Sequence, residues 1–222
     1  MYQDFLLAIF EYADKNNIRY CILRNYEQLP YDAGNDLDIL VHADDRSVLM
    51  QGIISIGANF EWSLVGKPCG FSLQALIFVK SDEHLRIDMF SFLTKGWLRY
   101  ADVNQVLATR VMYRDFWVAS QDFVYFTVVI KEFLTYGYVR DKYKQLLVDS
   151  KVTESEFIDF GKCFFTENSL KALYHRLNTS PHDKASISLV PKFLNVVKPV
   201  QILKWLFMRI YCSFSQRVWR RS

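Results

Sequence analysis

The sequence predicts an α+β protein: a small mixed sheet with flanking helices, followed by an all-helical half. Two observations support this class. As far as about residue 90, short apolar runs rich in β-branched residues are interspersed with helical patterns. After about residue 120, the apolar residues recur at spacings of three and four, which is typical of helices that bury one face. Segregation of strands and helices along a chain favours α+β over a regularly alternating α/β fold.

The N-terminal half begins with a helix over residues 3–15, which has an apolar face at helical spacing. The run 18–23 is short, apolar and β-branched, as expected of a buried strand. Asp44 or Asp45 is expected to cap a helix that ends near Ile56. The remaining strand candidates, of which the last two are expected to pair as a hairpin, are residues 37–41, 60–65, 71–79 and 85–90.

The C-terminal half is predicted to be helical, and no internal repeat or Gly/Ser-rich linker separates it from the first half. We expect the two halves to pack without a flexible joint. The expected helices cover residues 122–136, 139–148, 154–165 and 169–177. The expected domains are 1–118 (α+β), 119–198 (helical) and 199–222 (a basic amphipathic helix).

Composition excludes several classes of protein. The chain has 222 residues, of which 51% are hydrophobic and 23% charged, so disordered and fibrous classes do not fit. The four cysteines form no C-x-x-C pair, which argues against a zinc knuckle or a disulfide framework and predicts reduced thiols. The N-terminus has early acids and no basic region typical of a secretory signal. The expected location is therefore cytoplasmic.

The most informative stretch contains Asp36 and Asp38, which alternate with apolar residues in a predicted strand. Side chains two residues apart on a strand point to the same face. Two carboxylates held this close repel each other unless a cation joins them, and Mg²⁺ prefers oxygen ligands. Asp88 lies within the apolar run 85–90, where a charge is costly unless it is paired or metal-bound. An isolated D-x-D pattern is more often a solvated strand edge, so the third in-strand acid matters.

The order of these segments, with G-N-D-L-D-I-L-V before a helix and L-R-I-D-M-F after a hairpin, resembles the nucleotidyltransferase superfamily of polymerase-β type. Within it, the chain resembles a bacterial branch associated with surface-polysaccharide gene clusters. The resemblance implies two Mg²⁺ ions, a nucleoside triphosphate as substrate, and attack of an acceptor hydroxyl on the α-phosphate. It also implies that Asp36 and Asp38 are the paired metal-binding acids, and that Asp88 is the third acid, closest to the attacking hydroxyl.

The chain departs from that family at the end of the first strand. Where the family has Gly-Ser or Gly-Gly to hold the triphosphate, this sequence has Arg24 and Asn25. Arginine suits phosphate geometry, so these two residues are the expected phosphate contacts. Further candidates for contacts with the triphosphate are Lys67, Lys131 and Lys144.

Charge is distributed unevenly. From Lys184 onward the chain has eight basic residues and no acid, whereas the preceding 183 residues hold 19 bases and 24 acids. The acidic body argues against an extensive nucleic-acid interface. In the segment 199–222, an apolar stripe opposes arginines and lysines, a pattern that suits an anionic membrane surface. The same stripe also suits docking on the helical half, and both interpretations stay open.

Two other functions compete with an active polysaccharide-linked nucleotidyltransferase. The absence of the Gly-Ser motif favours a binding or regulatory module in which the fold is kept and catalysis is weakened, although three retained acids oppose it. The other alternative is a toxin–antitoxin nucleotidyltransferase that modifies a partner protein or tRNA. Turnover of a nucleoside triphosphate separates the first alternative from an enzyme.

Overall fold

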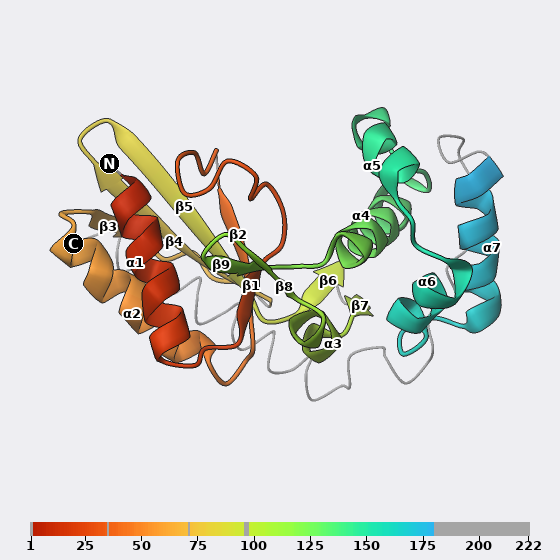
Figure 1. Ribbon diagram of the computed structural model, residues 1–222, viewed down its shortest axis with the longest axis horizontal. Helices are drawn as coiled ribbons and strands as arrows, with labels where there is room; N and C mark the ends of the chain where they lie inside the picture. The colour runs from red at the N-terminus through yellow and green to blue at the C-terminus, as the bar shows by residue number, and fades with distance from the viewer. Residues whose placement is uncertain (1, 35, 71, 96–97, 180–222) are drawn as a thin grey trace. The chain divides into compact units, whose positions relative to one another are not determined.

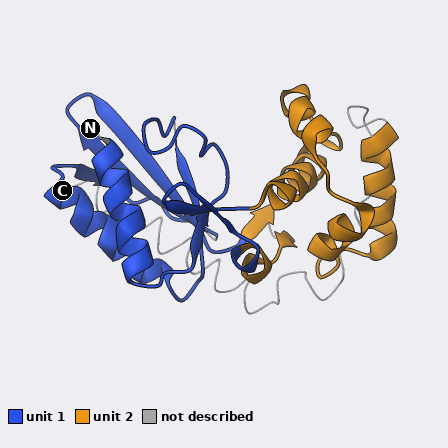
Figure 2. Ribbon diagram, in the orientation of Figure 1, with its two compact units in different colours: residues 1–92, 107–119, 202–222 blue, residues 93–106, 120–201 orange. Residues whose placement is uncertain are grey.

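The computed structural model describes residues 2–34, 36–70, 72–95 and 98–179. These residues cluster into two compact units (Figure 2). Unit 1 comprises the described residues of 1–92 and 107–119, and unit 2 those of 93–106 and 120–179. The α+β class predicted from the sequence is confirmed, because a mixed sheet forms most of unit 1 and helices form most of unit 2.

Unit 1 is built on a seven-stranded mixed sheet of order β3-β4-β5-β2-β1-β9-β8. The pairs β2–β5 and β1–β9 are parallel, and the other neighbours are antiparallel. The predicted hairpin is confirmed, since β4 and β5 pair along their full length up to Lys80 and Glu83. The strands are β1 (Tyr20–Ile22), β2 (Leu37–Val41), β3 (Ser63–Gly66), β4 (Leu73–Lys80), β5 (Glu83–Phe90), β8 (Val111–Tyr113) and β9 (Phe116–Val118).

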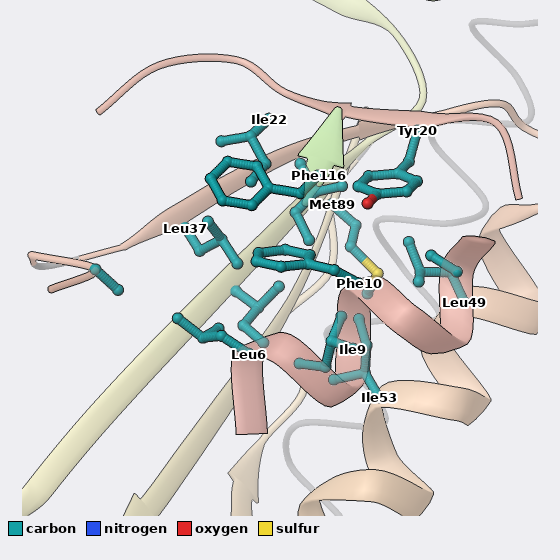
Figure 3. Packing of buried hydrophobic residues seen from close by; sticks show 14 of the residues in the cluster. Leu6, Ile9, Phe10, Tyr20, Ile22, Leu37, Leu49, Ile53, Met89 and Phe116 are labelled. Carbon is teal, nitrogen blue, oxygen red and sulfur yellow. The ribbon is translucent and has the colours of Figure 1, made fainter. Parts of the chain in front are cut away.

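Helices α1 (Tyr2–Lys15) and α2 (Arg46–Asn59) lie side by side and cover one face of this sheet (Figure 1). Figure 3 shows Leu6, Ile9 and Phe10 of α1 packed against side chains from the strands. Every second residue of β2 and β5 contributes to this core, because alternate residues of a strand face the same side. The core residues from these two strands are Leu37, Ile39, Val41, Leu85, Ile87 and Met89.

The start of α2 differs in one detail from the prediction. Asp45 occupies the N-cap position, but its side chain forms no capping hydrogen bond. Its carboxylate instead accepts hydrogen bonds from the backbone N–H and the guanidinium of Arg19, at 3.0 and 2.7 Å. The aspartate therefore ties the start of α2 to the residue before β1 through a charge-assisted hydrogen bond to arginine.

Strands β8 and β9 were not predicted, and they extend the sheet beyond β1. The turn between them carries Arg114, whose guanidinium donates to the carbonyl oxygens of Leu29 and Glu27. The ring of Tyr113 lies 5.0 Å from that of Tyr26, between ring centroids. These contacts attach the β8–β9 hairpin to the long segment that joins β1 to β2.

Unit 2 consists of a two-stranded ladder and a group of helices. Aromatic side chains dominate its interior, where the rings of Phe126 and Phe157 meet edge to face with centroids 5.2 Å apart. The predicted helices near 122–136, 154–165 and 169–177 are present. The elements of the C-terminal part are β6 (Leu93–Lys95), β7 (Leu98–Ala101), α3 (Val103–Ala108, which spans the boundary between the units), α4 (Gln121–Tyr136), η1 (Asp141–Tyr143), α5 (Lys144–Asp149), α6 (Glu154–Gly161) and α7 (Glu167–Thr179).

The single helix expected over 139–148 is wrong. Gly137 ends α4 in the left-handed conformation (φ 77°), and Arg140 is extended before the short helix η1. The guanidinium of Arg140 donates to both carboxylate oxygens of the buried Glu132 at 2.6 and 2.8 Å, and it stacks over the ring of Tyr136. The bidentate bond fixes Arg140 outside a helix, and helical structure resumes only after it.

This buried pair predicts a pH dependence for the stability of unit 2. Burial raises the pKa of Glu132, but the hydrogen bonds from Arg140 outweigh it and hold that pKa below its ordinary value. A carboxyl with a lowered folded pKa stabilises the fold above its unfolded pKa, and loses this contribution as pH falls through the folded pKa. We therefore expect Glu132→Gln to lower the melting temperature at pH 7 and to change it much less near pH 3. Thermal unfolding at both pH values, with Asp159→Asn as an exposed-pair control, measures the difference; equal effects of Glu132→Gln at both would contradict it.

Two further sequence-based expectations concern cysteines and the membrane. Cys21 and Cys163 are free thiols, whereas Cys69 is disulfide-bonded, so the prediction of reduced thiols is wrong for Cys69. Within the described part of the chain, no helix combines the length and apolarity that crossing a bilayer requires. The segment 199–222, for which a membrane surface and docking on the helical half both stay open, lies outside the described residues.

Candidate metal centre

The two strands at the middle of the sheet bring three aspartates to one face. In the parallel pair β2–β5, Asp38 lies opposite Asp88, and Leu37 and Ile39 lie opposite Ile87 and Met89. Because the side chains alternate, the apolar neighbours point to the helices and both acids point to the other face. Asp36, two residues before Asp38, lies on the same side.

The three carboxylates are close enough to share a cation. Each of Asp36, Asp38 and Asp88 offers an oxygen, and these oxygens all lie within 4.8 Å of one another. Asp38 and Asp88 are buried, each only 5% exposed, and Asp36 is half-buried. Like charges this close and this poorly hydrated are costly without positive charge nearby.

Two arginines supply such charge. The Nε of Arg24, in the segment that follows β1, donates to Oδ2 of Asp38 at 2.7 Å. The Nε of Arg86 donates to Oδ1 of Asp88 at 2.7 Å. Arg86 precedes Asp88 by two residues on β5 and therefore lies on the same face. Each buried acid thus has one guanidinium partner.

These arginines only partly compensate the cost of burial. Burial raises the pKa of the Asp38 carboxyl, Arg24 lowers it, and the charges of Asp36 and Asp88 raise it further, so that the net shift is upward. The hydrogen bond to Asp88, together with the charges of the other two acids, raises the pKa of Arg86. The upward shift at Asp38 means that the site still favours additional positive charge.

The five basic or polar residues expected to contact phosphate are distributed over both units. Arg24 is at the carboxylates, where it contacts an acid. Asn25 follows it, exposed and in the left-handed region (φ 57°). Lys67 is exposed in the segment after β3. The carbonyl of its neighbour Pro68 accepts a hydrogen bond from the backbone N–H of Ala75, and Ala75 lies opposite Asp88 in the sheet. Lys131 on α4 and Lys144 at the start of α5 are exposed residues of unit 2, and their role stays a prediction.

Sequence reasoning missed Arg86. A signal was present, because an arginine two residues before an in-strand aspartate must share its face. The partner of Arg24 was also missed, since nothing in the sequence places the residue after β1 beside Asp38 until β1 and β2 are paired in register, with Ile22 opposite Ile39.

The donor set fits a hard divalent cation. All three groups are carboxylates, which suit Mg²⁺ or Mn²⁺, and no cysteine or histidine is among the grouped residues. Asp36, Asp38 and Asp88 would hold the ion. The fold and this face together define an α+β protein with a three-carboxylate centre on the face of its sheet opposite α1 and α2.

Comparison with known proteins adds little to this description. No protein family matches the sequence, and no curated protein matches it. Among solved structures, the fold resembles that of a chain from H. pylori provisionally described as a nucleotidyltransferase, at 8% identity and a TM-score of 0.37. The match covers 79% of this chain and 92% of the other. A similarity this distant carries no conclusion about activity, which therefore rests on the aspartates.

Proposed function

We propose that the protein is a Mg²⁺-dependent nucleotidyltransferase, which transfers a nucleotidyl group from a nucleoside triphosphate to a hydroxyl or phosphate of an acceptor. One observation carries the proposal: oxygens of Asp36, Asp38 and Asp88 lie within 4.8 Å of one another, with Asp38 and Asp88 opposite each other on adjacent parallel strands and Asp36 directly before the first of these strands. Paired acids on one strand and a third on its neighbour are the arrangement that the sequence resemblance leads one to expect.

Each residue of the site has a separate role in this proposal. Asp36 and Asp38 hold the nucleotide side of the centre, and Asp88 holds the side of the acceptor hydroxyl. Two Mg²⁺ ions, when bound, would stabilise charge on the attacking and leaving oxygens. Arg24 and Asn25, which follow β1, would contact the triphosphate, and Lys67 is the further candidate in unit 1. Lys131 and Lys144 are candidates in unit 2.

The biological setting is a finer proposal. An acceptor linked to surface polysaccharide is suggested by the sequence resemblance, and a peripheral site at the inner face of a membrane by the basic segment 199–222. If both suggestions hold, a cytoplasmic enzyme would lie next to an acceptor that is attached to the membrane.

A second function has one specific observation in its favour. Asp38 and Asp88 already have arginine partners at 2.7 Å, so their charges are partly compensated without a metal ion, which suits a binding module without catalysis. Such a module would bind a nucleotide without turning it over.

Incubation with each of the four α-³²P-labelled nucleoside triphosphates, Mg²⁺ and extract of the source cells tests the proposal. We expect one nucleotide to label an acceptor fraction, with labelling abolished by EDTA and absent from the Asp38→Asn variant. Binding of a nucleotide with no transfer from any of the four would favour the binding module. Labelling that persists in Asp38→Asn would exclude the site.

A further inference from the structure

Each arginine partner occupies one oxygen of a carboxylate that a cation would also use. Arg24 is bound to Oδ2 of Asp38 and Arg86 to Oδ1 of Asp88. The oxygens of these acids that approach Asp36 lie within 4.8 Å of one another. A divalent ion placed among them would sit beside two guanidinium groups, and like charges at such distances repel strongly where water is scarce.

The two arginines are built to move, whereas the acids are not. Asp38 and Asp88 are fixed by the ladder of β2 and β5 and are about one-twentieth exposed. The side chains of Arg24 and Arg86 are 36% and 44% exposed. A long side chain with its head near solvent can swing away from its partner. Because the acids are buried, this is favourable only when another cation takes over the charge compensation.

We propose that Arg24 and Arg86 are exchangeable counter-ions, which neutralise the buried acids in the metal-free protein and transfer to phosphate oxygens of the substrate when a divalent cation takes their place. The exchange conserves charge compensation, because one divalent cation replaces the two positive charges of the guanidinium groups and frees both of them for the anion. This inference rests on the proposed function, and adds Arg86 as a substrate-binding residue and a coupling between metal and phosphate.

The exchange makes metal and anion binding mutually favourable. A metal ion alone must displace the guanidinium groups and leave them without an anion, which weakens its binding. An anion alone must separate the arginines from the acids, which then repel one another, and this weakens the binding of the anion. Each ligand removes the unfavourable free energy that opposes binding of the other, so the two bind cooperatively, and the coupling is reciprocal. A complex of the metal with a triphosphate therefore gains from both sites at once.

The test uses the full-length protein, with Mn²⁺ as the probe for the metal and the Mn²⁺–tripolyphosphate complex as the probe for the pair. Arg86→Gln and Arg24→Gln should each bind free Mn²⁺ about tenfold more tightly than the wild type, measured by the electron paramagnetic resonance of unbound Mn²⁺. The same variants should bind the Mn²⁺–tripolyphosphate complex at least about tenfold more weakly, measured by calorimetry. The two effects have opposite signs, which a merely structural role of the arginines would not produce.

Arg19→Gln is the matched control, because it breaks another arginine–aspartate ion pair, at the opposite end of β1. There the Nε of Arg19 lies 2.7 Å from Oδ2 of Asp45. It should leave both affinities unchanged. A similar rise in Mn²⁺ affinity in this control would mean that the change in net charge alone explains the effect, and would contradict the proposed exchange. Equal Mn²⁺ affinities in all proteins, or weaker binding of both probes in the two site variants, would also overturn it without touching the proposed function. If neither the wild type nor any variant bound Mn²⁺, the proposed metal centre itself would be contradicted.

Discussion

Asp38→Asn is expected to abolish nucleotidyl transfer and to leave the fold intact. An oxygen of its carboxylate lies within 4.8 Å of oxygens of Asp36 and Asp88, so the substitution removes one of the three acidic ligands of the site. Loss of metal-based charge stabilisation should lower kcat/KM by about a hundredfold or more. Asparagine keeps the shape and an oxygen that can accept from Arg24, so the strand pairing should persist. Turnover of the labelled nucleotide, with circular dichroism for the fold, measures both parts.

Stability should change in the opposite direction from activity. The pKa of Asp38 is raised, chiefly by burial, so at neutral pH its ionised form opposes folding, and this cost disappears as pH falls below the folded pKa. In EDTA at pH 7, Asp38→Asn should therefore melt at a temperature equal to or above that of the wild type, and the difference should vanish in acid. The control Asp45→Asn breaks an aspartate–arginine pair outside the site and should leave turnover unchanged. A marked fall in melting temperature for Asp38→Asn alone would identify a structural acid.

The sequence was sufficient for the parts of unit 1 in which periodicity and burial agree. Strand β2 was predicted at its observed bounds, because apolar residues at 37, 39 and 41 face α1 and α2 while acids occupy the other side. The convergence of Asp88 with Asp36 and Asp38 was predicted as well, since an acid within an apolar strand needs a partner. What the pattern could not supply was the register, in which Asp38 lies directly opposite Asp88.

Other elements depend on contacts that are distant in sequence. Strands β8 and β9 have three residues each, too few for a period to be visible, and β9 forms because it pairs in parallel with β1 nearly one hundred positions away. The break at Arg140 was missed because the local pattern is helical, whereas the bidentate bond to Glu132 holds the backbone extended. Tertiary contacts override local propensity in such cases.

Asp88→Asn is expected to lower kcat by about a hundredfold or more while changing nucleotide affinity only modestly. In the proposed site, this acid serves the acceptor hydroxyl, whereas Asp36 and Asp38 hold the nucleotide. Its position on β5, paired on both sides by β2 and β4, keeps the backbone in place when the charge is removed. Single-turnover kinetics at saturating nucleotide, together with the dissociation constant of the nucleotide, separate the two effects.

Arg86→Gln distinguishes loss of the acid from loss of its ion pair. It removes the 2.7 Å bond to Asp88 and keeps the carboxylate, so it should raise KM for the nucleotide and leave kcat within a few-fold. If Arg86→Gln instead reproduced the fall in kcat of Asp88→Asn, the pair rather than the carboxylate would set the rate. If Asp88→Asn unfolded while turnover per folded molecule stayed at the wild-type value, Asp88 would be a buried structural acid and the three-carboxylate centre would not be catalytic. A fall in kcat confined to Asp88→Asn assigns the carboxylate to the chemical step.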